Sequence, residues 1–189
     1  NDEKFSKAIN MSGVNSINWA RIIAQAVYYF YAYFKVGNDQ PLSFSVPTGN
    51  FGDIYAGYLA KKLGLPIDKL IVATNKNDIL HRAISEGDYT QKKVEETNTP
   101  SMDIQIASNF ERLLYDVKNC NSEATKQVMN KIKNNTYKID NNDLDKIKKN
   151  FTSETLDEAE TIEMIKDIYN KYQIVVDPHT AVGIGAVKK

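Results

Sequence analysis

The stretch Leu42–Asn77, LSFSVPTGNFGDIYAGYLAKKLGLPIDKLIVATNKN, decides the fold. It begins with a β-rich run over residues 42–46, which stops at a proline and is followed by a glycine-bearing loop over 48–53. The pattern then predicts a helix over 54–62 and a second strand over 69–74. A strand–loop–helix–strand unit of about 30 residues has the usual size of a parallel crossover. This part of the chain therefore predicts two neighbouring parallel strands.

The loop between the first strand and the helix is suited to hold a phosphate. Gly49 and Gly52 let the backbone turn so that successive N–H groups point inward, and the helix adds its positive dipole end. Gly52 is followed by Asp53 rather than Lys-Ser/Thr, which argues against a nucleoside-triphosphate loop. The glycine spacing and the Thr74-Asn75 end of the second strand argue against a dinucleotide site. The phosphate of a small cofactor fits best, although a tight turn without a ligand would also explain the loop alone.

Five longer stretches narrow the function further: VNSINWARIIAQAVYYF at 14–30, VPTGNFGDIYAGYLAKKLGLPI at 46–67, ATNKNDILHR at 73–82, TPSMDIQIASNFERLLYD at 99–116 and DPHTAVGIGAV at 177–187. In this order and spacing they resemble the threonine synthases, pyridoxal-phosphate enzymes of fold type II in the tryptophan synthase β-like superfamily. The resemblance covers nearly the whole chain and is weakest between Val117 and Ser153. It implies an α/β fold with an open, mostly parallel sheet flanked by helices.

The same resemblance implies a pyridoxal 5′-phosphate site in the glycine loop. Carried over residue by residue, the cofactor-binding set is Gly49, Asn50, Phe51, Gly52 and Asp53. Backbone N–H groups would make most of the contacts. Asp53 is more plausible as a helix cap than as a ligand, because its carboxylate would be repelled by a phosphate.

A second polar cluster precedes the helix that the sequence predicts over 19–34. Asn15, Ser16, Asn18 and Arg21 stand at or just after its start, which is a natural place for an anion. The family's substrate, O-phospho-L-homoserine, brings a phosphate of its own, and we assign it to this cluster as a hypothesis. Ordinary capping of a buried helix is the alternative.

Further polar residues follow the second predicted strand. Asn75, Asn77 and Asp78 are expected to bind substrate, because open α/β sheets place ligands at the carboxyl ends of their strands. A simple turn into the next helix is the alternative. Ser101 and Asp103 could orient substrate, but capping of a following helix is the favoured interpretation. Of the three arginines in the chain, 21, 82 and 112, we expect at least one to reach substrate.

The remaining chain divides into predicted elements around this unit. The helix over 19–34 is apolar on most of its circumference and should be buried. Other expected elements are a short helix after 78, a helix over 104–115, a helix with a capping box formed by residues 155 and 158, and a buried strand over 173–176. Lys- and Asn-rich residues 118–150 suggest an exposed helical excursion, with long disorder as the alternative. We therefore expect a cofactor-binding region over 1–116, an exposed helical insertion over 117–155 and a return to the core over 156–189.

Bulk composition excludes several classes of function. The chain has 189 residues, 24 basic and 24 acidic side chains, and hence no net charge to attract nucleic acid or an anionic membrane. Its apolar run over 26–34 is too short to span a bilayer. Cys120 is the single cysteine, which favours a reducing cytoplasm and excludes an internal disulfide. No metal-ligand spacing is present.

The lysine that holds the cofactor in the family lies in a Phe-Lys-Asp motif, which this sequence does not contain. We therefore expect a piece truncated at both ends and inactive alone. The full-length protein is expected to be a carbon–oxygen lyase that converts O-phospho-L-homoserine and water to L-threonine and phosphate. Alternatives are another fold type II enzyme, such as a threonine dehydratase or cysteine synthase, and a non-catalytic relative that binds phosphorylated ligands.

Overall fold

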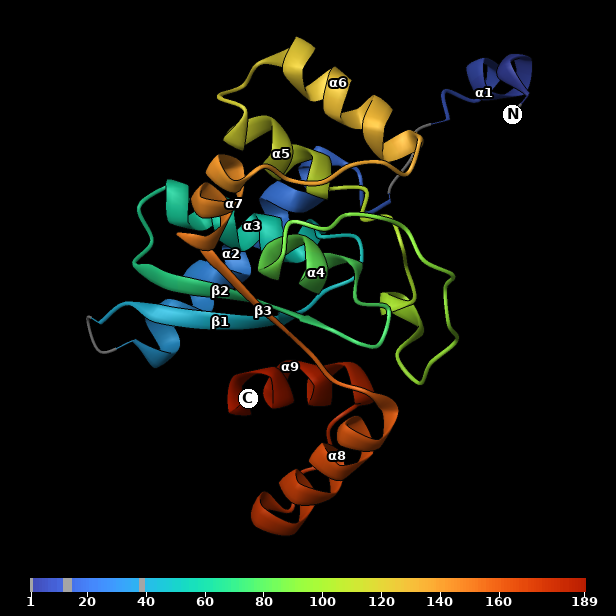
Figure 1. The fold of residues 1–189 in the computed structure, drawn as a ribbon. Coiled ribbons are helices and arrows are strands. Elements are labelled where there is room, and N and C mark those ends of the chain that lie inside the picture. The colour runs from blue at the N-terminus through green and yellow to red at the C-terminus, as the bar shows by residue number, and fades with distance from the viewer. Residues whose placement is uncertain (1, 12–14, 38–39) are drawn as a thin grey trace.

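A parallel sheet forms the centre of the molecule (Figure 1), as seen in a computed structural model that describes residues 2–11, 15–37 and 40–189. Its strands are β1 (Leu42–Pro47), β2 (Ile67–Thr74) and β3 (Phe151–Thr155), in the spatial order β1-β2-β3. Both pairings are parallel, and Val72 of β2 stands opposite Val46 on one side and Ser153 on the other. The predicted α/β class with a parallel sheet is confirmed.

The crossover predicted from residues 42–77 is present. Helix α3 (Gly52–Lys62) joins β1 to β2 and packs on both strands. It begins two residues earlier than the sequence predicts, and β2 also begins two residues earlier. The helix ends at Lys62, and the chain then turns at Gly64, whose φ of +101° is a backbone conformation that side chains with a Cβ rarely adopt.

The two faces of β2 belong to different apolar clusters. Leu70 and Val72 join the main core, whereas Ala73 and the partly buried Ile71 join a smaller cluster. This alternation is that of a strand covered on both faces. The main core is closed by α2 (Trp19–Val36), α3, α4 (Ile79–Ser85), α5 (Phe110–Val117), α6 (Ser122–Lys133) and α7 (Asn141–Lys148). The smaller cluster is closed by α9 (Pro178–Lys188), which lies across the opposite face of the sheet with α8 (Glu158–Tyr172) beyond it (Figure 1).

Residues 118–150 form helices α6 and α7, as predicted, but they are less exposed than expected. Six apolar side chains of this region are buried in the main core: Val128, Ile132, Tyr137, Ile139, Leu144 and Ile147. Strand β3 follows directly and was not predicted, because FTSET offers a single large apolar side chain in a polar neighbourhood. The division into three regions at 1–116, 117–155 and 156–189 stays a prediction. The insertion predicted over 117–155 would include strand β3, which belongs to the central sheet.

Three other local predictions are wrong. Residues 104–109 are not helical, and α5 begins only at Phe110. The capping box of α8 is formed by Asp157 and Glu160, not by residues 155 and 158. Residues 173–176 form no strand: Gln173 has a φ of +57° and Val175 is exposed. The chain continues into α9, whose first turn contains His179.

Helix α2 is amphipathic in its packing, although its sequence is apolar nearly all round. Ile22, Ala26, Tyr29 and Tyr33 are buried on the side that faces α3. The opposite side exposes large apolar side chains, among them Ile23, Val27, Tyr31 and Phe34. The prediction that this helix is buried therefore holds for one of its sides only. The short helix α1 (Glu3–Ala8) buries no residue.

Candidate functional site

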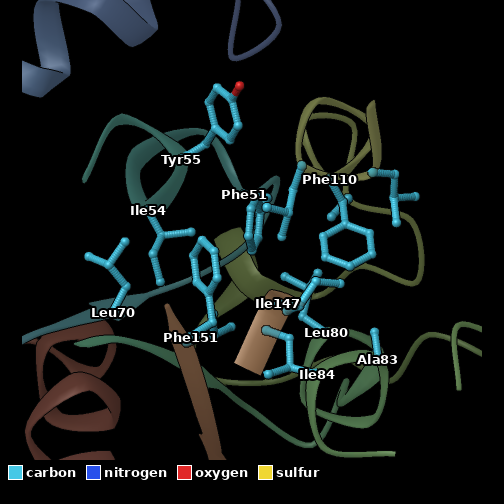
Figure 2. Close-up of a cluster of buried hydrophobic side chains, with 14 of the residues drawn as sticks. Phe51, Ile54, Tyr55, Leu70, Leu80, Ala83, Ile84, Phe110, Ile147 and Phe151 are labelled. Carbon is cyan, nitrogen blue, oxygen red and sulfur yellow. The ribbon is translucent and has the colours of Figure 1, made fainter. Parts of the chain in front are cut away.

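The glycine loop is anchored in the core by its own phenylalanine. Phe51 has a left-handed φ of 64° and its side chain is 1% exposed. Its ring lies 5.1 Å from that of Phe110 and 5.7 Å from that of Phe151, at the centre of the apolar cluster in Figure 2. The side chain therefore holds the loop to the core, and Phe51 can meet a ligand only through its backbone.

The neighbouring residues fix the rest of the loop. The backbone N–H of Thr48 donates to the Ala73 carbonyl at 2.8 Å, and its hydroxyl donates to the Val46 carbonyl at 2.6 Å. A Cβ on Gly49 would collide with the carbonyl oxygen of Ser101, in the short 3-10 helix η1 (Pro100–Met102). A glycine is therefore required where the loop passes this segment.

A row of backbone donors is left open in this loop. Within the described part of the chain, no N–H group from residue 49 to residue 54 donates a hydrogen bond. The last three of these groups belong to the first turn of α3, whose dipole places positive charge there. They line a cavity of about 250 Å³, closed from outside the loop by Ser16, Arg21, Gln25 and Ser101. This arrangement suits an anion.

A larger cavity, about 660 Å³, lies beside Trp19, Tyr55 and Arg112. Arg112 is engaged there in hydrogen bonds, and the Tyr55 hydroxyl donates to Asp116 at 3.1 Å. We assign the site to the smaller cavity, because it is the one lined by the open donors of the glycine loop.

The three arginines differ in what they contact. The buried Arg82 pairs with Asp78 at 2.9 Å and with Asp88 at 2.6 Å, so it serves the fold. Arg112 donates to two groups of the protein, which are described below. Arg21, in the first turn of α2, lines the cavity, and in the described part of the chain it forms no ion pair. Arg21 is thus the arginine best placed for a ligand.

The segment before α2 contains both turn and cap contacts. The Asn15 side chain accepts from the Ile17 N–H and the Asn18 side chain accepts from the Ala20 N–H, each at 3.0 Å. Asn18 is the N-cap of α2. Capping therefore accounts for Asn18, while Ser16 and Arg21 line the cavity.

Asp53 does not cap α3, because its side chain makes no cap hydrogen bond. It lines the cavity, and the Tyr29 hydroxyl donates to its carbonyl oxygen at 3.0 Å and reaches its carboxylate at 3.5 Å. Burial raises the pKa of Asp53, and the Tyr29 hydrogen bond acts in the opposite direction. The capping interpretation from the sequence is wrong.

The polar residues after β2 form a closed network. The Asn75 amide donates to Thr97, Thr99 and Asp103, and its oxygen accepts from the Asn77 N–H at 2.8 Å. The Asn77 amide in turn donates to Asp103 at 3.0 Å and to the Glu95 carbonyl at 2.9 Å. Both asparagines are 2% exposed.

Two neighbours of these asparagines also differ from the prediction. Asp78 pairs with Arg82 and Lys92 rather than lining the cavity of the glycine loop. Asp103 is an acceptor in the network and not a helix cap, since the helix that it was expected to cap starts later. The sequence pattern held no sign of this contact, because it joins residues 26 and 28 positions apart.

Comparison with known proteins finds relatives over the whole chain. No protein-family model matches the chain. A threonine synthase from Pseudomonas aeruginosa is 44% identical over 190 residues, covering 100% of this chain and 40% of the relative, and one from Saccharomyces cerevisiae is 45% identical with the same coverage. A crystal structure of PLP-bound threonine synthase from Brucella melitensis matches 99% of this chain and 41% of its own, with 46% identity and a TM-score of 0.95.

The chain belongs to the threonine synthase family. The resemblance inferred from its motifs is thereby confirmed. The chain spans about 40% of the length of the curated threonine synthases that it matches. Over the described residues, no helix is both long and apolar enough to cross a membrane.

Sequence reasoning missed Asn109, which contacts both segments that were predicted to bind an anion, the glycine loop and the start of α2. Asn109 is fully buried and contacts both Ser16 and Asn50. It lies within the SNFERLL stretch that contributed to the resemblance, but its spacing from the loop gave no reason to single it out.

Proposed function

We propose that the full-length protein is a threonine synthase that converts O-phospho-L-homoserine and water to L-threonine and phosphate. The observation that carries the proposal is the row of open N–H donors over 49–54 with Arg21 facing the same cavity. Two separate sets of anion donors suit a reaction in which cofactor and substrate each carry a phosphate. The homology to threonine synthases supports the same reaction.

The glycine loop fits the phosphate of pyridoxal 5′-phosphate. Gly49, Asn50, Phe51 and Gly52 would hold it through backbone N–H groups, since the Phe51 ring is turned into the core. Asp53 is the weakest member of the predicted set, because a carboxylate repels a phosphate. When bound, this cofactor supplies an electron sink for negative charge that develops on the substrate carbons.

The substrate phosphate is proposed to bind at the start of α2. Arg21 would donate two parallel hydrogen bonds to it, as a planar guanidinium can. Asn15, Ser16 and Asn18 would shape the turn that brings Arg21 to the cavity, since the Arg21 N–H donates to the Asn18 carbonyl at 3.1 Å. For Asn75, Asn77 and Asp78 a direct substrate contact stays a prediction, and their internal hydrogen bonds favour a role in shaping the adjoining loop.

The test uses the full-length protein with pyridoxal 5′-phosphate. We expect release of inorganic phosphate from O-phospho-L-homoserine together with an equal amount of threonine. Deamination of threonine or serine without phosphate release would assign the protein to a different fold type II reaction. Cofactor binding without either reaction would support a non-catalytic relative.

Two finer points belong to the same proposal. The isolated 189 residues are expected to be inactive, because they lack the Phe-Lys-Asp motif that carries the family's cofactor lysine. Borohydride reduction with pyridoxal phosphate should label no single lysine beside the glycine loop. We also propose a cytoplasmic location, in keeping with the single, exposed Cys120.

A further inference from the structure

Asn109 joins the two segments that are proposed to bind phosphate. Its side-chain amide nitrogen donates to the Ser16 carbonyl at 2.8 Å and to the Asn50 carbonyl at 3.1 Å. Its side-chain oxygen accepts from the Nε atom of Arg112 at 3.0 Å. Both hydrogens of this fully buried amide therefore point at backbone carbonyls, one in each segment.

Arg112 fixes the orientation of that amide and adds a hydrogen bond to the same segment before α2. Because the Asn109 oxygen faces a guanidinium donor, the NH₂ group must face the two carbonyls. The Nη2 atom of Arg112 donates to the Ile17 carbonyl at 2.8 Å, and the guanidinium lies 5.0 Å from the centre of the Trp19 ring. Together, Asn109 and Arg112 hold the consecutive carbonyls of residues 16 and 17; we call this pair the 109/112 clamp.

The two segments depend on the 109/112 clamp to different degrees. The Asn50 carbonyl also accepts the backbone N–H of Asn109 at 3.0 Å, a contact that survives any replacement of the side chain. Within the described residues, the carbonyls of Ser16 and Ile17 accept hydrogen bonds from the clamp side chains alone. Loss of the clamp should therefore release the segment before α2 and leave the glycine loop in place.

We propose that Asn109 and Arg112 are positioning residues that set the affinity for the substrate phosphate separately from that for the cofactor. They act through residues 15–18, whose turn starts α2 and carries Arg21 to the cavity. The inference rests on the proposed function, in which Arg21 meets the substrate. Neither residue touches the reacting atoms.

The first test is kinetic and uses the full-length protein. Asn109→Asp keeps the shape but removes both donated hydrogens, and Arg112→Lys is a milder change that keeps a cation without the planar fork. For each variant we expect the KM for O-phospho-L-homoserine to rise, by about tenfold for Asn109→Asp and less for Arg112→Lys. The dissociation constant for pyridoxal phosphate, followed by absorbance, should change by no more than about twofold.

A matched control separates positioning from general stability. Asp143→Asn makes the reverse carboxylate–amide exchange at a buried residue of α7, which pairs with Lys118 and Lys146 outside the site cavity. It should lower the melting temperature and leave both the KM and the cofactor affinity unchanged. If the clamp variants showed a lower melting temperature, a higher KM and a weaker cofactor affinity in parallel, their role would be merely structural and the proposal would be overturned.

A second readout does not depend on catalysis. Hydrogen exchange followed by mass spectrometry should show faster exchange in residues 15–20 of Asn109→Asp. Exchange should be unchanged at Thr48 and Tyr55, whose hydrogen-bonded N–H groups flank the glycine loop. Equal acceleration in both segments, or in neither, would overturn the proposal. Were the wild-type protein to release no phosphate from O-phospho-L-homoserine, the proposed function would fail, and this exchange pattern would still decide whether the clamp holds one segment and not the other.

Discussion

The chain segments that follow β1 and β2 stand at the same edge of the sheet, yet they are built in opposite ways. After β1, the backbone N–H groups of residues 49–54 have no acceptor in the described part of the protein, and a cavity faces them. After β2, Asn75 and Asn77 are closed by Thr97, Thr99 and Asp103. Because open N–H groups at a helix start attract anions, the first segment is the better candidate for a ligand site.

The largest effect should come from blocking the open segment, residues 49–54, whose backbone N–H groups face the cavity. In Gly49→Val, the added side chain would collide with the Ser101 carbonyl and displace the loop. We expect the affinity for pyridoxal phosphate to fall by about a hundredfold or more, measured by absorbance titration of the full-length protein.

Gly64→Ala is the control for a glycine replacement that destabilises the protein outside the site. Unlike Gly49, Gly64 has a positive φ, and a Cβ there meets no atom within 4 Å. It should cost about 1–2 kcal/mol of stability and leave cofactor affinity unchanged. A Gly49→Val protein with normal cofactor affinity would show that the loop does not hold the phosphate.

Breaking the hydrogen bonds of the closed segment, residues 75–78 after β2, should lower the stability of the protein and leave ligand affinity unchanged. Asp103→Ala removes the acceptor shared by Asn75, Asn77 and Thr97, and leaves buried donors unpaired. We expect the free energy of unfolding to fall by about 3 kcal/mol in urea denaturation. The exposed Asp68, whose carboxylate accepts from Ser43, is the control, and Asp68→Ala should cost less than about 0.5 kcal/mol.

This contrast also explains what the sequence could and could not predict. The crossover and the glycine loop were predictable, because glycine spacing and strand patterning are local signals read over about 30 residues. The closure of the second segment was not, because Asp103 reaches it from 26 and 28 positions away. The same holds for Asn109, which meets Ser16 across 93 positions.

Strand β3 and helix α2 show a second limit of sequence reasoning. FTSET has one large apolar residue, and its partner β2 supplies the context that makes it a strand. The apolar pattern of α2 does not say which side another element covers, so the exposure of Val27 and Phe34 could not be predicted. Both misses concern partners distant in the chain, whereas the predictions that held concern neighbours.

A smaller effect is expected from Arg21 of α2, which lines the same cavity and tests which of the two phosphates binds where. Arg21→Ala removes a charged hydrogen-bond donor from the cavity but, since the side chain is exposed, should hardly change stability. We expect kcat/KM for O-phospho-L-homoserine to fall by about 2 kcal/mol, roughly thirtyfold, with unchanged cofactor spectra. Arg21→Lys should recover part of the loss, because an ammonium carries the charge without the fork. Loss of the cofactor in Arg21→Ala would mean that the two phosphate assignments are exchanged.

The smallest effect is the pH dependence of stability that comes from Asp78, at the end of the closed segment, and from Asp88. Burial alone would raise the pKa of Asp78, but hydrogen bonds and charges from Arg82 and Lys92 outweigh it and lower the pKa below its ordinary value. Burial is likewise outweighed at Asp88, where Thr90 and Arg82 lower the pKa. Because both pKa values are lower in the folded state, their stabilisation is complete above the unfolded value of about 3.9 and is lost as the pH falls through the folded values.

Unfolding experiments between pH 6 and pH 2 test this assignment. Wild-type protein should lose up to about 1 kcal/mol through these two groups, and Arg82→Gln should show a weaker acid dependence on top of a lower stability at neutral pH. The KM for O-phospho-L-homoserine then decides the role of Asp78. Asp78→Asn should leave it unchanged if Asp78 only pairs with Arg82, because the amide still accepts a hydrogen bond from the buried guanidinium. A several-fold rise in KM without a matching loss of stability would instead place Asp78 at the substrate, and the closed segment would then share in binding after all.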